Sequence, residues 1–260
     1  MITTIRNLVH SKDLLLTWTS RTIQARYQQS VLGWIWAVIQ PVAQAVIFTV
    51  IFTFFVPINT GDIPYIIFAY SAMVPWTLLA SSLPDMSGAI VGNMSLVTKI
   101  YFPREILPIA AVLARLIDFG VAAVLLAVLI IIFRMPIYPP GLFFLPIILA
   151  IQLMLIIGLG LASAGANVFF RDIQPLLVLV IQLWFYASPI IYPVTSVPPQ
   201  LLPFYFLNPM AGILVAYRDV LLYGRIPGTY LIPSAIVALI IFLGGYWFFK
   251  RVEYLFADIV

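Results

Sequence analysis

Residues 142–166 read LFFLPIILAIQLMLIIGLGLASAGA, with no charged side chain anywhere in the run. An α-helix rises about 1.5 Å per residue, so about 20 apolar residues cross a hydrocarbon layer of about 30 Å. The run is continuously apolar and lacks the alternating pattern of about ten residues that marks a strand of a membrane barrel. It therefore predicts a membrane-spanning α-helix.

Comparable runs on both sides predict five further spans. Between Asp118 and Arg134 the uncharged stretch is too short to cross a membrane, so the third span has to begin near Leu107 and carry Arg115 and Asp118 in or close to the membrane. We expect an all-α membrane protein with six transmembrane helices. The spans are expected near residues 34–56, 64–84, 107–133, 142–166, 173–192 and 229–249.

The composition of the whole chain excludes several classes of function. Of 260 residues, 63% are hydrophobic and 8% are charged, whereas a soluble domain has about 45–50% apolar and about 25% charged residues. Cysteine is absent and His10 is the single histidine, so neither a disulfide framework nor a thiolate or multi-histidine metal site is expected. The phosphate loop GxxxxGK[ST], the nucleophile elbow and HExxH do not occur. We expect no enzyme, no metal site and no cofactor in this chain.

Lysine and arginine are distributed unevenly between the two sides of the six spans. Because cytoplasmic loops carry an excess of these residues, the richer side is expected to face the cytoplasm. This places both termini in the cytoplasm, and we expect the chain in the cell inner membrane. The richer side holds Arg6, Lys12, Arg21, Arg26, Lys99, Arg104, Arg171, Lys250 and Arg251, and the other side holds Arg134, Arg218 and Arg225.

Residues 1–33 are expected to form a cytoplasmic segment, and residues 34–260 the six-span domain. Within the first segment, apolar residues recur at roughly helical spacing against charged ones, which predicts an amphipathic helix over residues 3–28 along the inner membrane surface. The helix is a gate or docking element, or it is a simple interfacial anchor. The apolar residues are Ile5, Leu8, Val9, Leu15 and Leu16, and the charged ones are Arg6, Asp13 and Arg21.

Two loops carry more apolar surface than a plain linker needs. The cytoplasmic loop at residues 93–105 mixes charges with large apolar groups, which favours docking to a partner over embedding in the membrane surface. The external region from Pro193 to Gly228 is rich in proline and apolar residues, which favours short re-entrant helices between spans five and six over a surface loop. The candidate docking residues are Lys99, Tyr101, Phe102, Arg104 and Glu105.

Arg115 and Asp118 are three positions apart on one face of the third span. They can pair with each other, which lowers the cost of charge in hydrocarbon, or they can face a polar passage or a partner helix. Their types leave both readings open. The other spans hold few polar groups, which disfavours a carrier driven by protons or sodium and indicates that energy arrives from outside the chain.

Aromatic residues make up 15% of the chain and concentrate toward the outer side. They can form an interfacial belt, or their ring faces can stack on the C–H faces of sugar rings. Both readings remain open from the residue types alone. The candidates for a glycan channel are Phe54, Tyr65, Trp184, Tyr186 and Tyr192.

Several stretches together resemble the type-2 ABC exporter permeases for polysaccharides and polyol phosphates, the family that carries O-antigen, capsule and teichoic acid. They occur in the family's order and cover nearly the whole chain. The stretches are RYQQSVLGWIW at 26–36 followed by Gln40-Pro41, KIYFPREILP at 99–108, FRDI at 170–173, SPIIY at 188–192 and LNPM at 207–210.

The resemblance implies a homodimer of six-span permease subunits with two copies of an ABC ATPase subunit that binds ATP and Mg²⁺. It implies export of a polysaccharide, such as O-antigen, linked to a polyprenyl diphosphate lipid, and no nucleic acid partner. By the same likeness, the N-terminal helix gates lateral access of the lipid, the loop at 93–105 docks in the ATPase, and Arg26 and Tyr27 contact the lipid diphosphate.

The residues leave alternatives to this function open. Within the family, a teichoic acid exporter is the first alternative. A permease of a drug or small-lipid ABC exporter is the second, and it would have fewer polar and aromatic groups between subunits. An ion channel or proton-coupled carrier is the third, and it would work without a partner.

Overall fold

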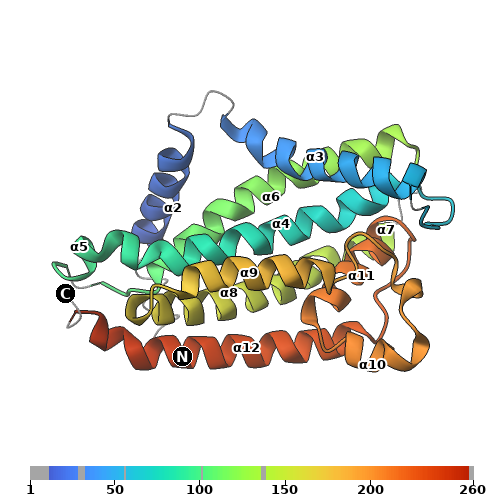
Figure 1. Ribbon diagram of the computed structural model, residues 1–260. Helices are drawn as coiled ribbons and strands as arrows, with labels where there is room; N and C mark the ends of the chain where they lie inside the picture. Colours follow the sequence, from blue (N-terminus) through green and yellow to red (C-terminus); the bar gives the residue numbers. More distant parts are fainter. Residues whose placement is uncertain (1–11, 29–32, 56, 101, 136–138, 258–260) are drawn as a thin grey trace.

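The computed structural model of the chain describes residues 12–28, 33–55, 57–100, 102–135 and 139–257 (Figure 1). Within these residues every regular element is a helix and no strand occurs. The long helices lie side by side as an elongated bundle, and α2 stands at a steep angle to them at one end (Figure 1). The all-α fold predicted from the sequence is confirmed.

Five helical segments are long and apolar enough to cross a membrane. They lie close to five of the six expected spans, because the charged residues that bound the apolar runs also lie near the helix ends. The segments are α3 (Trp36–Val50) with the π-helical turn Ile51–Phe55, α4 (Tyr65–Ala89), α6 (Ile106–Ile132), α7 (Pro139–Leu142) with α8 (Leu145–Phe169), and α12 (Leu231–Val252) with the 3₁₀ turn Glu253–Ala257.

The fifth apolar run forms a shorter helix than expected. Helix α9 (Ile173–Tyr186) has 14 residues, which is about 21 Å and less than a hydrocarbon layer of about 30 Å. The expected span ran to residue 192, but the chain turns after Tyr186. The Asn208 side chain donates to the Ala187 carbonyl at 3.2 Å, and the Tyr65 hydroxyl donates to the Ile191 carbonyl at 2.7 Å. Side chains from other elements therefore take the place of helical hydrogen bonds after Tyr186.

The region between α9 and α12 contains a bent pair of helices, as the sequence predicted. The segment Pro199–Tyr205, which ends with α10 (Leu202–Tyr205), meets α11 (Pro209–Leu221) at an angle of 109°. Asn208 caps α11, since its side-chain oxygen accepts from the Met210 amide at 3.1 Å. Counting this pair as one broken span gives six membrane segments in the described residues.

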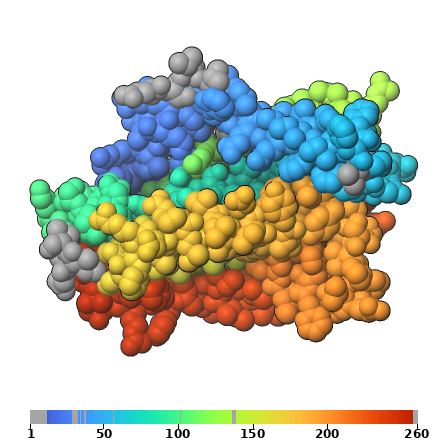
Figure 2. Space-filling view, in the orientation of Figure 1, coloured from blue at the N-terminus to red at the C-terminus, as the bar shows by residue number. Residues whose placement is uncertain are grey.

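Helix α4 lies at the centre of the main hydrophobic core, and most of its side chains are buried. Helices α8 and α12 pack closely where Gly158 faces Gly245, since a Cβ on Gly245 would collide with the Gly158 carbonyl oxygen. Small residues at such a crossing let two backbones approach each other. In the face drawn in Figure 2, α9 runs across the middle, with α2 and α3 above it and α12 below.

A second hydrophobic cluster lies at the end of the bundle that carries α5 (Met94–Val97). Phe256 packs in it against Phe249, with ring centroids 5.7 Å apart. Trp18 of α2 and Phe102, which lies in the loop between α5 and α6, pack against the same cluster. The buried members are Ile90, Val97, Leu107, Leu161, Ala164, Val168, Phe249 and Phe256.

Candidate functional site

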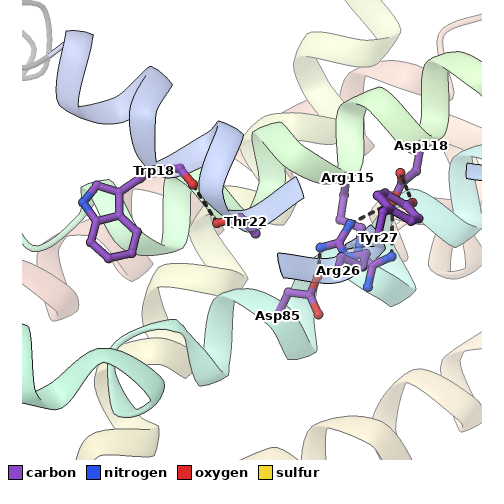
Figure 3. A network of polar contacts seen from close by, with 7 residues as sticks. All are labelled: Trp18, Thr22, Arg26, Tyr27, Asp85, Arg115 and Asp118. Atoms are coloured by element: carbon purple, nitrogen blue, oxygen red, sulfur yellow. Dashed lines mark hydrogen bonds and ion pairs between the residues drawn. The ribbon is translucent and has the colours of Figure 1, made fainter. Parts of the chain in front are cut away.

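The last turn of α2 (Lys12–Tyr27) contacts the facing sides of α4 and α6 through an ionic network (Figure 3). Arg26 Nη2 lies 2.7 Å from Asp85 Oδ2, and Arg26 Nη1 lies 2.9 Å from Asp118 Oδ2. The guanidinium therefore bridges a carboxylate on each of two membrane-spanning helices. Both ion pairs are partly buried.

Arg115 of α6 completes the network. Its Nε atom lies 2.7 Å from Asp85 Oδ2, and its Nη1 atom lies 3.2 Å from Asp118 Oδ2. The two guanidinium groups of Arg26 and Arg115 thus share the same two carboxylate oxygens. The two positive and two negative charges balance formally, which reduces the free-energy cost of placing ions between membrane-spanning helices.

Tyr27 adds a neutral donor to the network. Its hydroxyl donates to Asp118 Oδ1 at 2.6 Å, so both oxygens of that carboxylate accept hydrogen bonds. Burial raises the pKa of the Tyr27 phenol above its usual value, and the adjacent Asp118 carboxylate raises the pKa further. Tyr27 is therefore a hydrogen-bond donor throughout the physiological pH range. One turn earlier, the Thr22 hydroxyl donates to the Trp18 carbonyl at 2.8 Å within α2 (Figure 3).

The network borders a cavity of about 250 Å³ between α2, α3, α4 and α6. The cavity wall is mixed, with charged, hydroxyl, amide and aromatic groups. An apolar groove of about 490 Å³ adjoins it, since Val74 and Phe119 line both. The residues that line the cavity are Arg26, Tyr27, Trp36, Gln40, Val74, Thr77, Leu78, Ser81, Arg115, Asp118, Phe119 and Ala122.

The sequence predicted Arg26 with Tyr27 and Arg115 with Asp118 as two separate pairs, and the structure brings all four residues together. It adds Asp85, which sequence reasoning missed. The second span was expected to end at residue 84, so Asp85 was treated as a boundary residue. Because α4 continues to Ala89, Asp85 lies within the helix. An acid inside an apolar helix was the signal that could have identified it.

The predicted docking loop is attached to the end of α12. Glu105 is only 1% exposed, and one of its carboxylate oxygens lies 2.8 Å from Lys250 Nζ, which also lies 3.1 Å from Glu253. Arg104 donates to the Glu253 carbonyl. The side chains of Arg104 and Glu105 therefore both contact the end of α12. Lys99 is exposed, Phe102 is partly buried, and Tyr101 lies outside the described residues.

The five candidate glycan-channel aromatics do not share one environment. Phe54 and Tyr186 are exposed, at 75% and 57%. Tyr65 is buried and donates to the Ile191 carbonyl, and Trp184 Nε1 donates to Asn208 Oδ1 at 2.7 Å. The Tyr192 hydroxyl lies 3.0 Å from the Tyr205 hydroxyl. Tyr65, Trp184 and Tyr192 therefore hold the chain segments around the bent helical pair together.

Arg218 of α11 is a second buried cation that sequence reasoning treated as part of an external loop. It is 3% exposed. Its guanidinium donates to the carbonyl oxygens of Phe68, Pro189 and Ile190 and lies 3.6 Å from the centre of the Phe68 ring. It joins α4, the turn after α9 and α11. The described residues contain no group of three or more His, Cys, Asp or Glu that could hold a metal ion.

Comparison with known proteins identifies the family. The model of the ABC-2 type transporter family matches residues 13–222, which is most of the chain. The chain belongs to the ABC-2 type transporter family. This agrees with the resemblance predicted from the residues. It also agrees with the apolar helices, because members of a membrane-transporter family are multi-pass membrane proteins.

Curated relatives of this ABC-2 transporter chain are similar over nearly its whole length. The O-antigen export system permease protein RfbA of Klebsiella pneumoniae is 26% identical over 98% of this chain and 97% of the relative. The protein of the same name from Myxococcus xanthus is 29% identical over 87% of each. The polysialic acid transport protein KpsM of Escherichia coli is 26% identical over 87% of this chain and 89% of the relative.

Proposed function

We propose that this chain is the permease subunit of an ATP-driven exporter that moves a polyprenyl-diphosphate-linked polysaccharide, such as O-antigen, across the cytoplasmic membrane. One observation carries the proposal: relatives that match 98% and 87% of the chain are named for export of O-antigen. The similarity to a polysialic acid transport protein keeps capsular polysaccharide within the same substrate class.

The cavity beside Arg26 suits the phosphate end of such a lipid. A guanidinium matches phosphate oxygens in bidentate fashion, and a phenol donates to the same kind of acceptor. Arg26, Tyr27 and Arg115 all line this cavity. Asp118 lies about three turns from the beginning of α6 at Ile106, so the site is near the middle of this span and can be reached from the end expected to face the cytoplasm.

The energy for transport would come from a partner. In this proposal two permease chains form a homodimer, and two ABC ATPase subunits bind ATP and Mg²⁺ beneath it. Lys99, Tyr101 and Phe102 would contact the ATPase, while Arg104 and Glu105, bound to the end of α12, would hold the loop in position. Closure of the ATPase on ATP drives the channel open only if ATP binds one state more tightly than the other.

The exposed aromatics of the outer side would guide the sugar chain. Phe54 and Tyr186 are both exposed, and the faces of aromatic rings stack on sugar rings. Alanine at Phe54 or Tyr186 should slow glycan export more than it lowers the amount of folded protein. Equal loss of export and folded protein would leave these residues as membrane anchors only.

Expression in a strain that lacks its own exporter tests the function. The chain is produced with and without the ATPase from its genomic neighbourhood, and lipid-linked glycan is assayed at the cell surface. Restored export that requires the ATPase supports the proposal. Ion or solute flux from the chain alone would overturn it.

Docking through the loop is tested separately in the purified complex. Tyr101→Ala should uncouple ATP hydrolysis from export, and Tyr254→Ala, at an exposed tyrosine outside the loop at 93–105, is the matched control. Arg104→Ala should also uncouple the complex, because it releases the loop from the Glu253 carbonyl. Unchanged coupling in both Tyr101→Ala and Arg104→Ala would remove the loop from the docking surface.

A further inference from the structure

The cations of the cavity already hold anions that belong to the protein. Asp85 Oδ2 and Asp118 Oδ2 each accept from both Arg26 and Arg115. Several guanidinium donors converging on shared oxygens is the arrangement that also binds a phosphate group. A phosphate that reaches Arg26 therefore has to displace carboxylates.

The two arginines differ in what they are attached to. Arg115 is on α6, which packs against α4. Arg26 is in the last turn of α2. Among the described residues of this helix, Thr19 is the one that is buried. The contacts of Arg26 and Tyr27 with Asp85 and Asp118 join this turn to the α4–α6 pair. If these contacts are exchanged for others, the end of α2 is the part that moves.

We propose that Asp85 and Asp118 form an anionic latch that holds the end of α2 closed, and that the diphosphate of the substrate opens it by replacing them on Arg26. Arg115 keeps the two carboxylates neutralised while Arg26 is bound to the ligand. The proposal rests on the proposed function, since it assigns a release step to the same phosphate site. It assigns closure of α2 to Asp85 and Asp118 and neutralisation of their charges to Arg115, and neither role involves contact with the phosphate.

The role of Arg115 follows from the charge balance. With Arg26 removed from the network, Arg115 still contacts both carboxylates at 2.7 and 3.2 Å. Without Arg115, the same exchange would leave two carboxylates at this depth with no cation, which is costly. Loss of Arg115 therefore makes the latch tighter, whereas loss of either carboxylate makes it weaker. General unfolding of the variants would weaken the latch in every case, so it cannot explain a tighter latch in one variant and a weaker latch in another.

A distance measurement on the full-length chain tests the latch. Since the sequence has no cysteine, Gln24→Cys on α2 and Ser95→Cys on α5 accept two spin labels, and both positions are exposed. The labelled chain is placed in lipid nanodiscs, and the distance between labels is measured with inorganic pyrophosphate, farnesyl diphosphate, farnesol or sulfate. Pyrophosphate tests free diphosphate, and farnesyl diphosphate tests diphosphate on a lipid chain.

We expect a diphosphate to increase the population with the α2 end released, and farnesol and sulfate to leave it unchanged. A response to farnesyl diphosphate alone identifies lipid-bound diphosphate as the ligand, for which the apolar groove at Val74 and Phe119 adjoins the cavity. Equal responses to both diphosphates identify the phosphates as sufficient. An unchanged distance with every probe would overturn the latch.

Variants sharpen the test. Asp118→Asn should raise the ratio of released to closed α2 about tenfold without ligand, which corresponds to about 1.4 kcal/mol. Because Arg115 also lines the phosphate cavity, its role is tested without ligand: Arg115→Gln should lower the ratio of released to closed α2 about tenfold, which loss of a phosphate contact would not do. Asp13→Asn, which removes an exposed carboxylate of α2 outside the network, is the matched control and should behave as the wild type. Equal shifts in Asp118→Asn and Asp13→Asn would contradict the proposal.

The export assay separates this inference from the function on which it rests. Export that is restored with the ATPase, together with an α2 that no diphosphate moves, would overturn the latch alone. Release of α2 by diphosphate in a chain that exports no glycan would support the latch and overturn the proposed function.

Discussion

The Arg26 Nη1 atom lies 2.9 Å from the Asp118 Oδ2 atom, although 92 positions separate the two residues in the sequence. Through this contact, the helix that precedes the first span is attached to the middle of the α6 span. Both side chains are mostly shielded from solvent, at 20% and 12% exposed. The interaction should therefore be stronger than an ordinary surface ion pair.

A double-mutant cycle measures that interaction. Arg26→Gln and Asp118→Asn should each lower the free energy of unfolding, and the pair should lower it less than the sum of the single changes. We expect an interaction energy of about 1–3 kcal/mol, as for residues in one ionic network. Unfolding in mixed detergent micelles gives the four values. Strict additivity would contradict a direct Arg26–Asp118 contact.

Tyr27→Phe removes the hydrogen bond to Asp118 without changing the ring. A hydrogen bond to a charged group contributes about 1.5–3 kcal/mol, so the variant should be less stable by about that amount at pH 8. Burial and Asp118 raise the pKa of Tyr27 in the folded chain. The contribution is therefore complete below the unfolded value of about 10 and is lost as the pH rises through the raised pKa. Unfolding at pH 8 and above pH 10 should show the difference from the wild type becoming smaller.

Arg218→Met should be strongly destabilising. The substitution leaves the carbonyls of Phe68, Pro189 and Ile190 without their donor in a buried site. We expect a loss of roughly 3–5 kcal/mol in the free energy of unfolding, as when one side of a buried charged contact is removed. Arg225→Met, at an exposed position of the same region between α9 and α12, should change the free energy of unfolding by less than about 0.5 kcal/mol. Similar losses in both variants would argue against a special role for Arg218.

Two adjacent glycines of α12 should respond in opposite directions to alanine. A Cβ at Gly245 collides with the Gly158 carbonyl oxygen, whereas a Cβ at Gly244 meets nothing within 4 Å. Gly245→Ala should cost about 1–3 kcal/mol because α8 and α12 have to separate. Gly244→Ala should be neutral or stabilising by up to about 1 kcal/mol, because alanine favours helix. Thermal unfolding of the two variants in the same detergent compares them directly.

The sequence predicted the helices better than it predicted their ends. Apolar runs between charged residues located five long helices, because length and hydropathy decide whether a segment spans a membrane. The end of α9 at Tyr186 was not predictable in this way, since residues 187–192 are as apolar as a span. The side chains of Tyr65, Asn208 and Arg218, which are distant in sequence, bind the carbonyls of that segment.

The candidate site was predicted in part. Charged residues within an apolar run identified Arg115 and Asp118, since intramembrane ions are rare and have identifiable partners, whereas Arg26 was implied by the family resemblance. The pairing of Arg26 with Asp85 and Asp118 depends on how α2 approaches α4 and α6, and no local pattern encodes that approach. Arg218 was missed because it was counted only among the positive charges on the side opposite the cytoplasm, and no local pattern indicates which carbonyl groups it contacts.

The contact of Trp18 with the second hydrophobic cluster gives α2 a further property. That cluster contains Val97, which is part of the candidate docking loop at 93–105, and Phe256 of the final turn. From Trp18 to Arg26 the helix rises about 12 Å. Helix α2 therefore connects the second hydrophobic cluster, which Trp18 contacts, with the charged cavity, which Arg26 lines. A movement of the loop at 93–105 and an exchange of anions at Arg26 would therefore both displace α2.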